Sequence, residues 1–199
     1  MSQAPVTAAL LAALSQEVRP FLRRHKARRL KGAARPAWEF PLRTGQGLLV
    51  LSGVGQDAAG RAAAFIVEHY EPRVFISLGF GGAVTPELPH GALVLGETVW
   101  RYEPGSGALA ELTIPRPPAG LEDLVDRLKA AGLPAFRGSV VTSPVIIHKA
   151  GQGSALTHLL HPVLDLETGA AAREIGGRNL PFLALRAVTD IYKLSLIHI

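Results

Sequence analysis

The sequence predicts an α/β fold in which helices cover both faces of a central, mixed and mostly parallel β-sheet, giving three layers. Apolar runs of strand length alternate with stretches of helical periodicity along the chain, which is the pattern of βα units. Several of these runs are apolar on both sides, as strands between two helical layers are. The 199 residues are 48% hydrophobic, enough for a real core in a single domain.

The N-terminal half is expected to supply the first strand, a hairpin and a long helix. The expected elements are a strand over 6–13, a short helix over 15–26, strands over 37–43 and 47–51, and a helix over 56–70. Pro20 restricts where the first helix can begin. The TGQG turn joins the second and third strands as a hairpin, which makes the sheet mixed. The helix over 56–70 turns one face inward, formed by Ala59, Ala63, Ile66 and Val67.

The C-terminal half is expected to alternate strands and helices around one long loop. The expected elements are strands over 73–78, 92–100, 138–142, 161–166 and 181–188, helices over 121–131 and 167–175, and a Pro- and Gly-rich loop over 103–118. The helix over 121–131 is expected to turn Leu121, Leu124, Val125 and Leu128 inward. Ligands of such sheets bind beyond the carboxyl ends of the strands, so the residues that follow each strand are the candidates for function.

Composition excludes several classes of protein. The chain has no Cys, so disulfides, thiolate metal sites and Cys nucleophiles are excluded. The longest apolar-leaning run, Val6 to Leu14, has nine residues, whereas a membrane-spanning helix needs about 20. That run has no basic segment before it, as a signal peptide would. We therefore expect a cytoplasmic protein without a transmembrane segment.

Positive charge is concentrated in one segment. The net charge is +5, and eight of the 21 Lys and Arg lie between Arg19 and Arg35 with no acid among them. Outside this segment, 13 basic residues face 16 acidic ones. The segment is either a solvated helix face and loop or a contact surface for an anionic partner, such as an anionic membrane surface. Phe21 is the one Phe, Tyr or Trp in this segment, which argues against nucleic-acid binding by base stacking.

The last six residues, LSLIHI, match the translation of a common sequencing adapter. We therefore expect a single domain over 1–193, a non-native tail over 194–199, and a C-terminal helix that is truncated.

Three carboxylates follow predicted strands: Glu17, Glu167 and Asp190. Asp190 ends the apolar segment PFLALRAVTD, where partial desolvation suits an acid to donate a proton. Two carboxylates on opposite sides of a sugar are the minimum set for hydrolysing a glycosidic bond. Each acid taken singly would equally fit a helix N-terminus or a surface salt bridge.

Two glycine-rich turns also follow strands. SGVGQDAA is a weak dinucleotide-binding pattern, because the acid expected about 20 residues later is not at a strand end. Its backbone N–H groups either hold an anion or form a tight turn. LGFGGAV, with three glycines between Gly79 and Gly82, would let the backbone approach a ligand closely. The HLLH pair His158 and His161 is followed directly by Pro162, which argues against a shared helical face, and it lacks an acidic partner, so no metal site is expected. His148 and Lys149 are either a loop or a substrate contact.

These segments together resemble the nucleoside phosphorylase/nucleosidase superfamily, with a layout similar to methylthioadenosine/S-adenosylhomocysteine nucleosidases. The resemblance runs from Val6 to Asp190 through AALSQEV, SGVGQDAA, SLGFGGAVTPELPHGALVL, DLETGAAA and PFLALRAVTD. It implies a phosphorylase/hydrolase-like fold, a purine nucleoside substrate, no cofactor and a homodimer. Phe80 departs from the small hydroxyl residue that the resemblance leads one to expect, and would either narrow the site or stack on a ligand.

The resemblance assigns a role to each site residue. Glu17 would activate the attacking water, Glu167 would accept hydrogen bonds from the ribose hydroxyls, and Asp190 would protonate the leaving purine. The expected substrate contacts are Gly79, Phe80, Ile146, Ile147, Leu166 and Thr189. Phosphorylases of this superfamily bind phosphate with an arginine just before the signature loop. Ser77 occupies that position here, so the resemblance favours hydrolysis over phosphorolysis. A phosphorylase, a non-catalytic nucleoside-binding module and a dinucleotide-dependent oxidoreductase remain alternatives.

Overall fold

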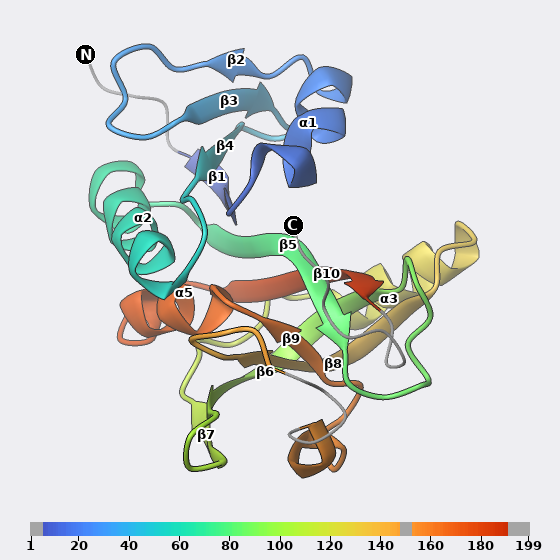
Figure 1. Ribbon diagram of the computed structural model, residues 1–199. Helices are drawn as coiled ribbons and strands as arrows, with labels where there is room; N and C mark the ends of the chain where they lie inside the picture. The colour runs from blue at the N-terminus through green and yellow to red at the C-terminus, as the bar shows by residue number, and fades with distance from the viewer. Residues whose placement is uncertain (1–5, 148–152, 191–199) are drawn as a thin grey trace.

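The computed structural model describes residues 6–147 and 153–190, and Figure 1 shows their arrangement. The strands are β1 (Val6–Ala12), β2 (Arg28–Arg29), β3 (Ala37–Pro41), β4 (Gln46–Leu51), β5 (Val74–Ala83), β6 (Leu93–Glu103), β7 (Ala108–Leu112), β8 (Ala135–Thr142), β9 (Val163–Asp165) and β10 (Phe182–Asp190). The helices are α1 (Ser15–Arg24), α2 (Gln56–Tyr70), α3 (Leu121–Ala130) and α5 (Thr168–Ile175), with a 3₁₀ turn, η1, over Gly153–Leu156. None of the helices in these residues is both long and apolar enough to cross a membrane.

The strands form one mixed sheet, as predicted. Parallel pairings join β4, β1, β5 and β10 in one block and β6, β8 and β9 in another. Antiparallel pairings of β10 with β6 and of β5 with β9 connect the two blocks. The strands β5, β10, β6, β8 and β9 therefore close into a ring. On the other side, β4, β3 and β2 continue the sheet to an open edge.

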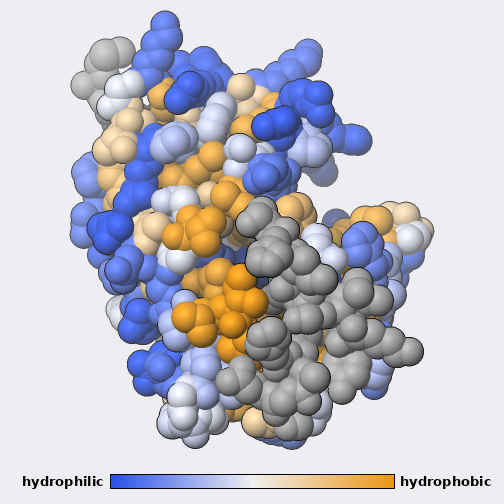
Figure 2. Space-filling model, viewed as in Figure 1, coloured by the Kyte–Doolittle hydropathy of each residue, from blue (hydrophilic) through white to orange (hydrophobic). Residues whose placement is uncertain are grey.

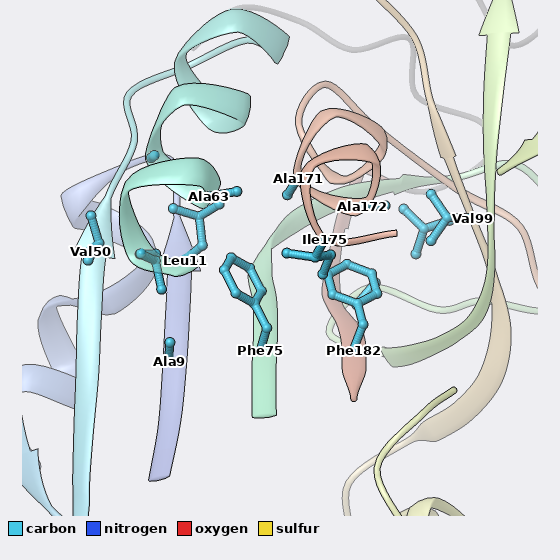
Figure 3. Close-up of a cluster of buried hydrophobic side chains, with 14 of the residues drawn as sticks. Ala9, Leu11, Val50, Ala63, Phe75, Val99, Ala171, Ala172, Ile175 and Phe182 are labelled. Atoms are coloured by element: carbon cyan, nitrogen blue, oxygen red, sulfur yellow. The ribbon is translucent and has the colours of Figure 1, made fainter. Parts of the chain in front are cut away.

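Helices pack on both faces of the sheet, which confirms the predicted three layers. On one face α2 and α5 lie side by side (Figure 1). Their small residues, including Ala63 and Ala171, let both helices approach the strands closely. Figure 3 shows them above a cluster that contains Phe75 and Phe182, both fully buried. On the other face α1 buries Val18, and α3 buries Leu121 and Val125.

The glycine-rich segment after Leu78 is part of a strand and not the loop that its composition indicates. The strand β5 continues to Ala83, because Gly79 to Gly82 pair with β10 and Gly82 and Ala83 also pair with β9. The glycines serve close packing within the sheet: a Cβ on Gly81 would lie 3.3 Å from Cβ of Arg186.

Two further expectations are wrong. Residues 103–118 are not wholly a loop, because Ala108–Leu112 pair antiparallel with the long strand β6. Leu124 is 38% exposed and does not point into the core. The helix α3 covers the sheet with one narrow stripe, in which only Leu121 and Val125 are buried.

Candidate active site

Glu17 is fixed by three backbone N–H groups from two elements. It lies in the first turn of α1, and its Oε2 accepts hydrogen bonds from the N–H groups of Ala13 (2.9 Å) and Leu14 (2.8 Å). The bond from Leu14 is one half of a capping box, in which a glutamate at the third helical position satisfies the N-cap residue. Its Oε1 accepts from the N–H of Phe80 in β5 (3.1 Å). The carboxylate therefore bridges the end of β1 and the middle of β5.

Gly79 makes this position available. An ideal Cβ at Gly79 would lie 2.6 Å from Oε1 of Glu17, a distance at which one of the two groups must move. The glycine-rich segment was expected to let the backbone approach a ligand; the group that lies against the backbone of Gly79 is the Glu17 carboxylate of the protein itself.

Glu167 lies between β9 and α5, where its Oε1 accepts a hydrogen bond from the N–H of Gly55 (2.9 Å). Burial raises the pKa of Glu167, and the neighbouring charge of Asp165 raises it further, while the bond from Gly55 and the charge of Arg186 act in the opposite direction. Gly55 adopts a φ of 95°, a conformation that favours glycine. The turn SGVGQDAA therefore uses this N–H to hold a carboxylate of the protein.

A buried ion pair that the sequence analysis missed lies next to Glu167. Arg186 in β10 and Asp165 in β9 have side chains 2% and 1% exposed. Asp165 accepts hydrogen bonds from Nε (2.9 Å) and Nη2 (2.6 Å) of Arg186, from Oγ1 of Thr142 (2.5 Å) and from the N–H and hydroxyl of Thr168. A buried pair of this kind is stable only when its remaining donors and acceptors are satisfied, and here they are.

The guanidinium of Arg186 is fully engaged by acceptors of the protein. Its Nη1 donates to the carbonyl oxygens of Ser77 (3.0 Å) and Leu185 (2.9 Å), and its Nη2 also donates to Oγ of Ser77 (2.9 Å) and to the hydroxyl of Thr168. The one signal in the sequence for this ion pair is the single Arg in the apolar run PFLALRAV. Because a charge is rarely buried without a partner, an Arg in a buried strand indicates an opposite charge beside it.

Glu17 and Glu167 line the same cavity of about 320 Å³. The other lining residues are Ala13, Leu14, Val54, Phe80, Gly81, Gly82, Ser143, Val145, Ile146, Ile147, Leu164, Asp165, Leu166 and Thr189. Its mouth is apolar and exposed, since Val54 is 57%, Val145 54% and Ile146 59% accessible. A much smaller cavity of about 10 Å³ lies deeper, between Glu17, Ser77, Gly79, Phe80, Glu167 and Arg186.

The structure thus brings together most of the residues predicted for the site. Phe80 lines the cavity without filling it, and it holds Glu17 through its backbone. Gly79 lines the smaller cavity only. Asp190 is buried at the end of β10 and pairs with the cavity residue Gly82, but only its neighbour Thr189 is a lining residue.

The two histidines of HLLH are not among the residues that line the cavity. His158 is exposed, and Nδ1 of His161 lies 2.8 Å from the backbone oxygen of Arg137. His148 and Lys149 lie outside the described residues, as does the tail over 194–199. Within the residues that the structure describes, no group of three or more His, Asp or Glu side chains is arranged to hold a metal ion.

Comparison with known proteins places this geometry in a family. The sequence profile of the phosphorylase superfamily matches residues 7–195. The 5′-methylthioadenosine/S-adenosyl homocysteine nucleosidase of Campylobacter jejuni superimposes with a TM-score of 0.81 at 20% identity, covering 98% of this chain and 90% of that one. The corresponding enzyme of Neisseria meningitidis, in complex with methylthio-immucillin-A, gives 0.76 at 22% identity, with 94% and 87% covered. A mutant of the futalosine hydrolase of Helicobacter pylori gives 0.76 at 12% identity, with 93% and 86% covered. At these identities the structural matches establish a shared fold.

Proposed function

The chain belongs to the phosphorylase superfamily, and from that membership we propose that it is a purine nucleosidase. It would hydrolyse the N-glycosidic bond of an adenosine-type nucleoside, with attack by water and protonation of the departing base. The observation that supports this most directly is that Glu17 and Glu167, 150 positions apart in the sequence, line one cavity of about 320 Å³. The nucleosidases of C. jejuni and N. meningitidis, which share the fold, support the same chemistry.

Glu17 is proposed as the base. Glu17 lines the small cavity of about 10 Å³, close to the lower limit for one water molecule of roughly 10–15 Å³. A water there would lie between this carboxylate and the larger cavity. Its deprotonation would direct the oxygen at the anomeric carbon of a ribose bound beyond it. General base assistance of this kind is typically worth about 100- to 10,000-fold in rate.

Glu167 and Asp190 are proposed to act on the two ends of the bond that breaks. Ionised Glu167 is a pure acceptor and would hold the ribose hydroxyls, with Leu166 packed on the sugar. Ile146 and Ile147 would line the purine. Asp190, buried beside the cavity residues Thr189 and Gly82, would protonate the purine on its imidazole side and so neutralise the leaving group as the ribosyl cation develops.

The saturation of Arg186 favours water over phosphate as the nucleophile. A phosphorylase needs cationic donors free to bind phosphate, and Arg is the residue best suited to this. Arg186 is the one arginine lining either cavity described above, and its donors already serve Asp165, Ser77, Thr168 and Leu185. Phosphorolysis is the second candidate and would require these bonds to break.

We also propose a cytoplasmic homodimer. The exposed apolar mouth formed by Val54, Val145 and Ile146 is a surface that a second copy would cover, which would close the site on that side. Equilibrium sedimentation of the purified chain tests this, because a monomer at micromolar concentration would contradict it.

The test is release of free adenine from methylthioadenosine, followed by mass spectrometry with and without phosphate. We expect adenine and free methylthioribose in both buffers. Asp190→Asn should abolish release and Glu17→Gln should slow it by at least about 100-fold, while Asp126→Asn, an exposed acid on α3, should have no effect. A sugar phosphate as product would establish phosphorolysis. Calorimetric binding without turnover would establish a binding module.

A further inference from the structure

The basic segment found in the sequence contributes exposed cations at one end of the molecule (Figure 1). Exposed cations follow one another over the last turns of α1, the two-residue strand β2 and the loop after it. They are Arg19, Arg23, Arg24, Lys26, Arg28, Arg29 and Lys31. Figure 2 shows hydrophilic side chains over the top of the molecule, where Figure 1 places α1 and β2. We call these seven residues the cationic surface.

Few groups of the protein neutralise this surface. No acid lies between Glu17 and Glu39 in the sequence. Arg28 pairs with Glu39 at 2.5 Å but keeps 74% of its side chain exposed, and Arg29 lies over the ring of Trp38 at 6.0 Å. The rest of the chain outside residues 19–35 is mildly acidic. The molecule therefore has one strongly positive end and a weakly negative remainder. The electric field of a charged partner would orient it with the positive end toward negative charge.

We propose that the cationic surface docks the protein on an anionic phospholipid bilayer. Each basic side chain near such a surface raises the affinity about fivefold, so seven together give strong binding without any inserted apolar residue. A bilayer matches a charge distribution confined to one end, because it attracts that end and repels the acidic remainder. Residues 29–36 also line an open pocket of about 490 Å³, which includes Arg29, Lys31 and Arg35. This pocket has room for a phosphate headgroup.

A lipid surface fits better than a single-stranded nucleic acid. Nucleic-acid platforms of this kind offer exposed rings on which bases stack. Here the rings nearest to the cations contact one another: Phe21 packs against His25 at 4.3 Å and edge-on against Phe40 at 4.9 Å. Trp38 is covered by Arg29.

Docking would place the candidate site near the bilayer. Glu17 and Arg24 belong to the same helix, seven residues apart, which corresponds to about 10 Å along the axis. The half-buried Arg35 also donates from Nη1 to the carbonyl of Ser52 (3.1 Å), at the start of the turn whose Gly55 holds Glu167. The surface and the cavity are therefore linked through α1 and through the bond from Arg35 to Ser52.

The experiment is co-sedimentation of the full chain with large vesicles, of phosphatidylcholine alone or with about one third phosphatidylserine. We expect binding to the anionic vesicles only, weakening steeply with salt. The variant Arg23→Gln, Arg24→Gln, Lys26→Gln, Lys31→Gln should lose about 600-fold in affinity, about fivefold for each charge removed. The matched control neutralises four exposed cations elsewhere, Arg127, Lys129, Arg173 and Arg178, and should bind almost normally.

Three outcomes would overturn the proposal. They are equal binding to neutral and anionic vesicles, equal loss in both variants, and a preference for single-stranded DNA or RNA over anionic vesicles at matched charge. The binding assay requires no turnover, so it is independent of the proposed function. Adenine release from a soluble nucleoside should be unchanged in both variants, which also confirms that they fold.

Discussion

Replacing Gly79 by alanine tests whether the position of the Glu17 carboxylate sets the rate. The new Cβ would lie 2.6 Å from Oε1 and 3.3 Å from the carboxyl carbon of Glu17. Ordinary contacts begin near 3.4 Å, so the carboxylate must retreat by roughly 0.8 Å. Gly79 has no positive φ, so the substitution acts through this contact and not through backbone strain.

The size of the effect follows from the bonds that the carboxylate makes. A retreat from β5 lengthens the 3.1 Å bond from the N–H of Phe80 beyond hydrogen-bonding distance. Loss of one bond to a charged group costs about 1.5–3 kcal/mol, and a displacement near 1 Å in a catalytic group costs about 100-fold in rate. We expect kcat for base release to fall about 100-fold, with KM nearly unchanged because Glu167 holds the ribose.

The assay is steady-state adenine release from methylthioadenosine, combined with urea unfolding. Gly105→Ala is the matched control, since it also lacks a positive φ and its Cβ would meet nothing within 4 Å. Wild-type kcat in a folded Gly79→Ala protein would show that the rate does not depend on where this carboxylate lies, and the assignment of Glu17 as base would be wrong.

Three further predictions follow from the same geometry. Since the pKa of Glu167 is raised, its contribution to stability is present below the ordinary glutamate value and is lost as pH rises through the raised value. As pH rises from the ordinary glutamate pKa through the raised pKa of Glu167, Glu167→Gln should therefore gain stability relative to wild type in urea titrations. As pH falls through the same range, KM of the wild type should rise. Arg186→Met leaves the charge of Asp165 buried and should lower the free energy of unfolding by about 3–5 kcal/mol. Arg137→Gln removes an exposed ion pair with Glu97 and should lower it by less than about 1 kcal/mol in the same assay. Phe80→Ala keeps the backbone bond to Glu17 and should change KM more than kcat; an equal loss in kcat would contradict this.

The elements with clear periodicity could be predicted from the sequence. The helix over Gln56–Tyr70 has the predicted bounds, because its alanine-rich face and Glu71-Pro72 define both its inner side and its end. The continuation of β5 through GFGGA could not be predicted in this way. Glycine composition indicates a turn when each residue is considered locally, whereas here the partners that require glycine, the Glu17 carboxylate and the side chain of Arg186, come from distant parts of the chain.

That Glu17 and Glu167 lie at one cavity could be predicted because each follows a strand, and the carboxyl ends of strands gather at one edge of such a sheet. Their roles stay predictions, and Asp190 ends β10 without lining that cavity. The network that supports the two glutamates could not be predicted. Asp165 and Arg186 each occupy one position in an apolar run, and nothing local in the sequence pairs them. Their contact depends on the closed ring of β5, β10, β6, β8 and β9, which brings β9 and β10 to opposite sides of β5.

The groups that hold the two carboxylates determine the net charge around the cavity, and this charge affects which nucleophile can enter. Glu17 and Glu167 are both held by backbone N–H groups, and not by cations. Arg186, the arginine that lines the smaller cavity beside them, is paired with Asp165, so it adds little net positive charge. Among the described residues that line the larger cavity there is no Lys or Arg. A dianionic phosphate entering this cavity would face two carboxylates without compensation, at a desolvation cost that grows with its charge. Neutral water meets no such barrier, and the same carboxylates would stabilise the positive charge that develops on the ribosyl ring. The charges on the described lining of the cavity therefore support the proposal of hydrolysis independently of any single hydrogen bond.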